Sequence, residues 1–142
     1  KKENISAISI PNKAMEKIIT AFGRNRWPID FLVYEGKIAE VLEKATVVIG
    51  SPTVLAGPHP CAAYAAFLAN TLRPKTRFAS IISSYGWAGK TVEQLTALMS
   101  NLKVQFLEPV IAKGEPKETD YVALDRLADD ILAKHKEAGI AN

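Results

Sequence analysis

Two stretches of the chain place glycine, hydroxyl and aromatic residues directly after an apolar run of strand length. One is residues 50–58, Gly-Ser-Pro-Thr-Val-Leu-Ala-Gly-Pro, and the other is residues 84–89, Ser-Tyr-Gly-Trp-Ala-Gly. Glycine lets the backbone approach a ligand closely, hydroxyls form hydrogen bonds, and the rings of Tyr85 and Trp87 offer faces for stacking. This combination indicates a binding site for a planar ligand with polar edges.

The elements that must position these stretches alternate between strand and helix patterns. Strand patterns cover residues 5–10, 29–34, 46–49, 77–83 and 104–111, and helix patterns cover residues 12–22, 38–45, 60–72, 91–102 and 120–138. This alternation predicts an α/β fold: a three-layer sandwich with a five-stranded parallel sheet in the order 2-1-3-4-5. Because the carboxyl ends of parallel strands meet at one edge, the two stretches should lie side by side there. Pro109 cannot donate a ladder hydrogen bond, which predicts an edge position or a bulge in the last strand.

Length and composition fit a single domain over residues 1–142. The chain is 48% hydrophobic, enough to cover a sheet on both faces. Its formal net charge of +3 is scattered over helix faces, which favours a solvated surface and argues against nucleic-acid binding. No apolar run reaches the roughly 18 residues that span a bilayer and no signal peptide is visible, so we expect no membrane insertion and a cytoplasmic location. The start at Lys1 without a methionine is typical of part of a longer polypeptide.

Few residues suit catalysis or metal binding. His59 and His135, the only histidines, lack neighbours at metal-ligand spacing, so no metal site is predicted. Cys61 falls near a helix N-terminus beside His59, a position that can activate a thiol, but a lone cysteine among alanines is more often a small core residue. The chain has neither a P-loop nor a G-x-G-x-x-G after its first strand, which argues against those nucleotide-binding classes. We assign no catalytic residue, and whether the chain acts as an enzyme stays open.

The two glycine-bearing stretches also resemble a known family. A flavin has the planar shape and the polar edges that they favour, and their sequences are similar to the second and third flavin loops of the flavodoxin-like domain of flavodiiron proteins, the A-type flavoproteins. The similarity runs best over residues 47–110, and Ser-Tyr-Gly-Trp after a buried strand is its most specific part. It implies FMN as the cofactor. The implied binding residues are Ser51, Pro52, Thr53, Val54, Leu55, Ala56, Gly57, Ser84, Tyr85, Gly86, Trp87, Ala88 and Gly89.

In that family the domain is an electron-transfer module. By similarity, backbone amides near Thr53 and Gly86 would contact the polar edge of the ring, with Tyr85 or Trp87 near its plane. Oxygen or nitric oxide is reduced in the family at a di-iron centre in a preceding metallo-β-lactamase-like domain, whose ligand cluster this sequence lacks. The implied partner is a redox protein or such a di-iron domain, on the same polypeptide or on another chain.

The connection after the first strand departs from the family pattern. Flavodoxin-like domains resemble one another in placing several Ser, Thr and Gly residues there around the FMN phosphate, whereas this chain has Pro11-Asn12-Lys13-Ala14. Asn12, Lys13 and the helix dipole could hold a phosphate with fewer donors, because Pro11 removes one amide. Two hypotheses follow. The chain is an FMN-binding redox module, or it is a flavodoxin-like domain that has lost FMN and serves as a structural or interaction module.

The helix pattern over residues 60–72 is Ala-rich and apolar almost all round. A helix of this kind must be covered on more than one side. Either it is buried within the domain, or part of it contacts another subunit or domain. The excess of apolar surface around Tyr64 and Phe67 favours association, and we expect a homo-oligomer.

Overall fold

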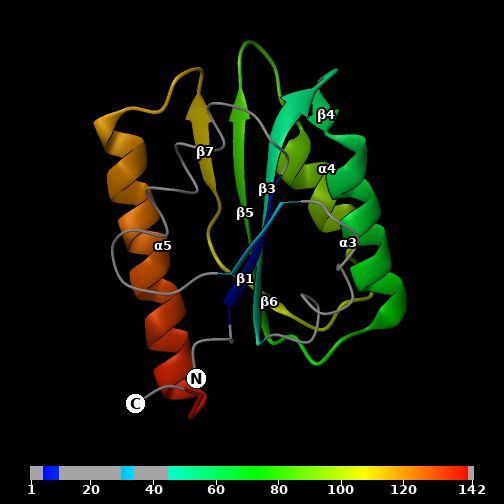
Figure 1. Ribbon diagram of the computed structural model, residues 1–142, viewed down its shortest axis with the longest axis vertical. Helices are drawn as coiled ribbons and strands as arrows, with labels where there is room; N and C mark the ends of the chain where they lie inside the picture. The colour runs from blue at the N-terminus through cyan, green and yellow to red at the C-terminus, as the bar shows by residue number, and fades with distance from the viewer. Residues whose placement is uncertain (1–4, 10–29, 34–44, 141–142) are drawn as a thin grey trace.

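The strands form one sheet with parallel pairing along its length (Figure 1). The computed structural model describes residues 5–9, 30–33 and 45–140. β1 (Ile5–Ser9) lies between β2 (Asp30–Val33) and β3 (Thr46–Val54), and β3 pairs on its other side with β5 (Phe78–Tyr85). β5 corresponds to the fourth predicted strand, and the fifth lies beside it. The sheet therefore has the predicted order 2-1-3-4-5, and the predicted fold is confirmed.

The last strand of the sheet is split in two. β6 (Gln105–Phe106) and β7 (Val110–Lys113) both pair in parallel with β5. Between them, the Leu107 N–H still donates to the Ala79 carbonyl at 2.8 Å. Pro109, which has no N–H to donate, immediately precedes the second half, so the strand is interrupted where the sequence predicts a bulge.

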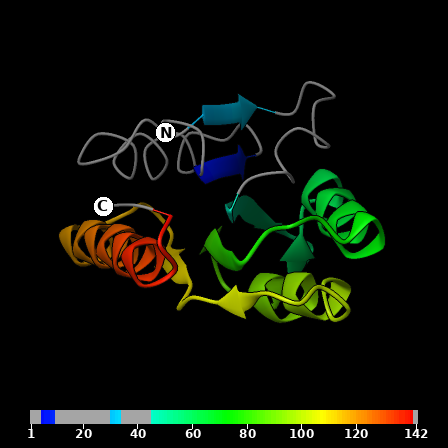
Figure 2. The ribbon, with the colours of Figure 1, turned by 90° about the horizontal axis from the view of Figure 1, so that it is seen from below.

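Helices cover both faces of the sheet (Figure 2). On one face α5 (Glu118–Glu137) packs through Leu124, Leu127 and Ile131 against sheet residues that include Val48 and Ile82. On the other face α3 (Pro60–Leu72) and α4 (Thr91–Leu98) pack against neighbouring sheet residues such as Val47, Ile49 and Ile81. Successive strand residues point to opposite faces, so β3 and β5 supply both cores and are mostly apolar, with a few buried hydroxyl residues such as Thr46 and Ser80. The helices predicted over 12–22 and 38–45 lie outside the described residues, apart from Ala45.

Helix boundaries follow local hydrogen bonding. α3 begins with Pro60 after His59, whose Nδ1 accepts the Cys61 N–H at 3.2 Å, and it ends at Arg73 in the left-handed region with φ 46°. α4 ends at Leu98 instead of the predicted residue 102. There the Met99 N–H is shared between the Leu95 and Thr96 carbonyls, which tightens the last turn. No helix within the described ranges is long and apolar enough to cross a membrane.

Candidate functional site

Residues 50–58, predicted as a loop, form a β-hairpin. β3 continues to Val54, and β4 (Gly57–Pro58) turns back and pairs with it antiparallel. The two residues of the turn, Leu55 and Ala56, have φ values of 50° and 65°. This is the backbone of a type I′ turn, which usually has Asn-Gly or another glycine-containing pair. The prediction of a loop was wrong because neither turn residue is one that normally marks a tight hairpin.

The hairpin and the end of β5 lie side by side, as predicted from the shared carboxyl edge. Ser51 is in register with Ser83, and Pro52 with Ser84. The Ser83 hydroxyl donates to the Ser51 carbonyl at 2.8 Å, while the Ser51 hydroxyl donates to the Pro52 carbonyl and accepts the His59 N–H. Both side chains are buried. The Ser83 hydroxyl therefore joins residues 50–58 to the end of β5, directly before residues 84–89, and the Ser51 hydroxyl fixes the hairpin to His59, which follows it.

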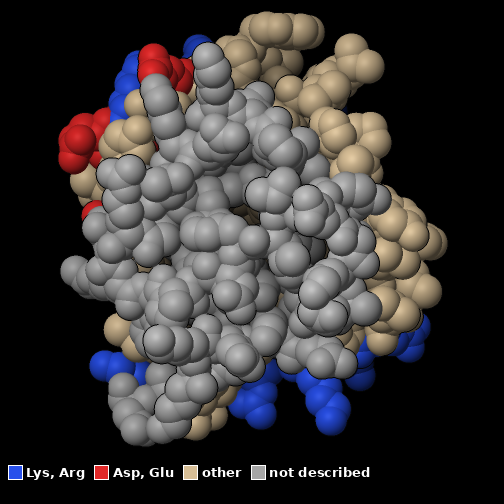
Figure 3. All heavy atoms as spheres, viewed as in Figure 1, with Lys and Arg blue, Asp and Glu red and all other residues tan. Residues whose placement is uncertain are grey.

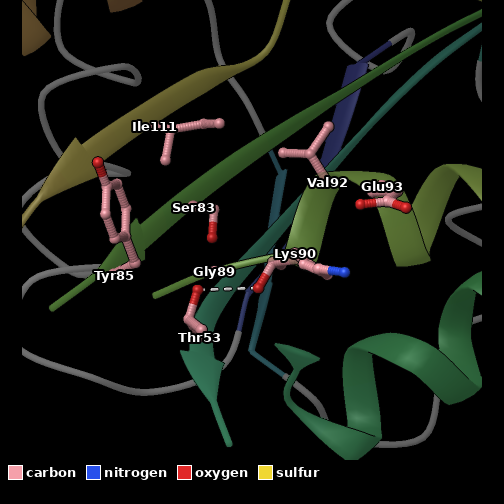
Figure 4. Close-up of a pocket in the computed structure, with 9 residues that line it drawn as sticks. Thr53, Ser83, Tyr85, Gly89, Lys90, Val92, Glu93 and Ile111 are labelled. Atoms are coloured by element: carbon pink, nitrogen blue, oxygen red, sulfur yellow. Dashed lines mark hydrogen bonds between the residues drawn. The ribbon is translucent and has the colours of Figure 1, made fainter. Parts of the chain in front are cut away.

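A second set of bonds joins the tip of the hairpin to the start of α4. The Lys90 N–H donates to the Ala56 carbonyl at 2.9 Å. The hydroxyls of Thr53 and Thr91 lie 2.9 Å apart and form the bond drawn in Figure 4. Because these bonds fix the tip of the hairpin to Lys90 and Thr91, directly after residues 84–89, the two segments form one preorganised edge.

A cavity of about 440 Å³ opens beside the hydrogen bond between Thr53 and Thr91. Three of its lining residues belong to the predicted binding set, namely Thr53, Tyr85 and Gly89. Figure 4 shows them beside Ser83 and Ile111 from the sheet and the first turn of α4. The α4 residues that line the cavity and that the prediction missed are Lys90, Thr91, Val92 and Glu93. The only signal that could have found them was their place directly after Gly89, at the start of a helix.

Two other predicted residues are exposed at the same edge. Trp87 is 89% exposed on the segment between β5 and α4, and Leu55 is 97% exposed at the hairpin tip. A Cβ placed on Gly86 would meet nothing within 4 Å, so the backbone beside Trp87 is open to a ligand. Asn12 and Lys13, predicted to contact a phosphate, lie outside the described residues.

His59 and Cys61 have a local structural role. His59 Nδ1 accepts the backbone N–H of Cys61 and caps α3. Within the described ranges, no group of three or more His, Cys, Asp or Glu side chains could hold a metal ion. The site that the structure brings together is therefore a cavity with hydroxyls and an aromatic side chain, beside an exposed tryptophan.

The fold and the paired segments at the carboxyl edge define a flavodoxin-like α/β domain. No family model matches the chain. The rubredoxin-oxygen oxidoreductase of Megalodesulfovibrio gigas is 27% identical over 95 residues, which is 66% of this chain and 24% of that protein.

Solved structures of similar proteins have the same fold. The rubredoxin oxygen:oxidoreductase from Desulfovibrio gigas superposes with a TM-score of 0.82 at 21% identity, covering 94% of this chain and 36% of that one. The Flv1 flavodiiron core from Synechocystis sp. PCC6803 gives 0.81 at 17% identity, with 96% and 37% covered. A flavodoxin from the domain Archaea gives 0.77 at 19% identity, with 93% and 99% covered.

These likenesses confirm the predicted resemblance to flavodiiron proteins at the level of the fold. The chain corresponds to the whole of the archaeal flavodoxin, but it spans only about a quarter of the curated relative and little more than a third of the two larger structures.

Proposed function

We propose that this chain binds the isoalloxazine ring of FMN at the edge formed by the β3–β4 hairpin and residues 84–89, and acts as an electron-transfer module. The proposal rests on the way in which these two segments are held together. Both reach one sheet edge, where Pro52 pairs with Ser84, and hydrogen bonds join the hairpin to Ser83 and Thr91 on either side of residues 84–89. Residues from both segments line a cavity of about 440 Å³. Ligand pockets usually fall between about 300 and 1,000 Å³.

The residues at this edge fit a flavin ring. Tyr85 and the exposed Trp87 supply aromatic faces, and the Thr53 hydroxyl and the open backbone at Gly86 supply polar groups. Bound there, FMN would supply one- and two-electron transfer, and the protein would supply orientation and hydrogen bonds. Residues 51–57 and 84–89 are the binding residues of this proposal, with Asn12 and Lys13 as its phosphate contacts.

The names of similar proteins support an electron-transfer role, because one is an oxidoreductase that takes its name from rubredoxin and oxygen and another is a flavodiiron core. We propose that this chain exchanges electrons with a redox protein or with a di-iron domain, on the same polypeptide or on another chain. A cytoplasmic location and a homo-oligomer belong to the same proposal.

The contacts to the phosphate are the weakest part of the proposed FMN site. Residues 11–14 offer fewer hydroxyl and amide donors than a flavodoxin-like domain usually places there. Each charge-assisted bond contributes about 1.5–3 kcal/mol, so losing two or three would weaken binding by several factors of ten. The purified protein should be colourless and should bind added FMN with micromolar affinity.

A titration with FMN and with riboflavin tests the proposal. Flavin fluorescence and the visible spectrum should report binding of both ligands with similar strength, because riboflavin has the ring without the phosphate. Trp87→Ala should weaken both alike if Trp87 stacks on the ring. A strong preference for FMN would show that Asn12 and Lys13 hold the phosphate well. Failure of either flavin to bind at millimolar concentration would reject the redox function.

In that case a second candidate function would stand. The hydroxyl of Ser51, in the first predicted binding segment, and that of Ser83, directly before the second, are already used inside the protein. This observation favours a flavodoxin-like domain that has lost FMN and serves as a structural or interaction module.

A further inference from the structure

The outer face of α3 is apolar and uncharged. None of its 13 residues carries a charge, and Tyr64, Phe67 and Leu72 are each about half exposed on the surface. Ala62, Ala65, Ala66 and Ala69 occupy the opposite, buried face against the sheet. The small alanines, with Leu68 beside them, fill the packing against the sheet, whereas Tyr64, Phe67 and Leu72 are directed outward, where water gives them no stabilisation.

Basic residues continue this surface beyond the C-terminus of α3. Arg73, Lys75 and Arg77 lie in the connection to β5, and all three are exposed. Lys103 lies close to them, because the Gln105 N–H donates to the Arg77 carbonyl at 2.9 Å and the Asn101 N–H donates to Asn70 Oδ1 on α3 at 2.7 Å. None of the four forms an ion pair with another described residue.

Acidic residues are almost absent from the described segments that form this side of the molecule. Between residues 60 and 105 the only one is Glu93, in the first turn of α4, at the opposite end of that helix from Lys103. Figure 3 shows the same division, with uncharged side chains along the α3 flank and Lys and Arg gathered at the lower edge. The exposed apolar residues of α3 and the four cations together form what we call the α3 surface.

We propose that the α3 surface is a docking site for an acidic protein partner that carries apolar side chains. Tyr64, Phe67 and Leu72 would contact the apolar residues of the partner, and Arg73, Lys75, Arg77 and Lys103 would contact its carboxylates. Aromatic anchors bordered by charges are the usual arrangement at protein interfaces, where the anchors supply most of the affinity and the charges raise the association rate.

Charge argues against a second copy of this chain as the occupant of the α3 surface, so the homo-oligomer of the proposed function would form through another surface. In a parallel pairing of two α3 helices, the four cations of one copy would face those of the other. In an antiparallel pairing they would face the N-terminus of the partner helix, which has the positive end of the helix dipole and no acidic residue in its first turn. An acidic partner avoids both repulsions.

A nucleic acid or an anionic membrane is a poorer match. Phosphate groups would be attracted to the four cations, but the half-exposed Tyr64, Phe67 and Leu72 would have no comparable partner along a phosphate backbone. A protein partner uses both parts of the α3 surface.

Binding of a designed probe to the flavin-free chain tests this proposal separately from the FMN site. The probe is a fluorescein-labelled amphipathic peptide of about 18 residues, or five helical turns, with leucines on one face and glutamates beside them. Fluorescence anisotropy should show saturable binding that weakens with salt. Phe67→Glu should weaken it at least about tenfold and Lys75→Glu several-fold, whereas Trp87→Ala should leave it unchanged.

Matched variants separate the α3 surface from general hydrophobicity and charge. Val122→Glu replaces an exposed apolar residue of α5, and Lys113→Glu replaces an exposed lysine of β7. Both should bind the acidic peptide like the parent chain. A peptide with lysines in place of the glutamates should bind the parent poorly and the Lys75→Glu variant better.

Three results would overturn the proposal. The first is no binding of the acidic peptide, or equal weakening by Val122→Glu and Phe67→Glu. The second is tighter binding of a DNA duplex or of phosphatidylserine vesicles that Lys75→Glu abolishes. The third is a dimer in sedimentation experiments that Phe67→Glu dissociates, which would identify a second copy as the occupant.

Discussion

The Ser83 hydroxyl on β5 donates a 2.8 Å hydrogen bond to the backbone carbonyl of Ser51 on β3, and both residues are buried. This bond joins β3, where it leads into its hairpin, to the end of β5, directly before residues 84–89 of the proposed flavin site. A buried carbonyl that loses its donor keeps the full cost of desolvation.

Ser83→Ala should therefore lower the free energy of unfolding by about 1–3 kcal/mol. It should also weaken flavin binding, because the hairpin would no longer be fixed against β5. Urea denaturation and a riboflavin titration measure the two effects. Ser100→Ala, at an exposed position after α4, is the matched control and should change stability by less than about 0.5 kcal/mol. Equal stability of the two variants would show that the Ser83 bond contributes little.

The β3–β4 turn should gain stability from residues that favour positive φ. Leu55 and Ala56 both occupy the left-handed region, which costs about 1–2 kcal/mol for an ordinary residue. Leu55→Asn with Ala56→Gly provides the preferred type I′ pair and should raise the free energy of unfolding by about 1 kcal/mol or more. The midpoint of urea denaturation measures the gain. The control Ala97→Gly, on the exposed side of α4, should be destabilising. A loss of stability in the Asn-Gly variant would contradict the turn geometry.

Buried His135 should make stability depend on pH near neutrality. Its Nε2 lies 2.6 Å from Thr46 Oγ1, it is 1% exposed, and burial lowers the pKa of the imidazole from 6.5. The unfolded chain therefore takes up a proton near pH 6.5 while the folded chain does not. This contribution to stability is present in full above 6.5 and is lost as the pH falls toward the lower folded pKa.

The loss should approach at most about 1.4 kcal/mol for each pH unit in that window. Urea denaturation between about pH 5.5 and 7.5 measures the slope, since only histidine side chains normally titrate there. His135→Gln should remove most of it. If the pH dependence of stability persists in His135→Gln, a group other than His135 causes it.

Periodicity and strand ends were enough to predict the fold and the shared edge. The mostly apolar runs at 46–49 and 78–82, each followed by a helix pattern, predicted buried parallel strands, and this determined where residues 50–58 and 84–89 would meet. The hairpin at Leu55–Ala56 could not be predicted, because its turn conformation is imposed by the bonds of Ala56 to Lys90 and of Thr53 to Thr91. Tertiary contacts of this kind leave no local pattern in the sequence.

The same reason explains which site residues were missed. Glycines and aromatics pointed to residues 84–89, but the lining of the cavity by Val92 and Glu93 depends on how α4 sits over the sheet. Ser51 and Ser83 were correctly placed at the edge. The Ser51 hydroxyl was predicted to contact the ligand, whereas the structure shows the hydroxyls of both residues bonded within the protein.

Gly86 and Gly89 provide a matched pair for the proposed flavin site, because both belong to residues 84–89 but their surroundings differ. A Cβ on Gly89 would lie 3.1 Å from Thr53 Oγ1 and 3.2 Å from Tyr85 Cβ, whereas a Cβ on Gly86 would meet nothing within 4 Å. Thr53 and Tyr85 both line the cavity, so a methyl group at position 89 must displace residues of the site itself.

Gly89→Ala should weaken riboflavin and FMN binding to a similar extent, by about tenfold if the shift costs 1.4 kcal/mol of binding free energy. Gly86→Ala leaves the packing intact, and any effect on binding would come from the ring approaching the backbone at that position. Titration of both variants with both flavins, beside their urea denaturation curves, separates the two causes. If Gly89→Ala lowers stability but leaves flavin binding unchanged, the ring does not occupy the cavity beside Thr53 and Tyr85. If Gly86→Ala alone weakens binding, the ring lies on the outer side of residues 84–89, against Trp87.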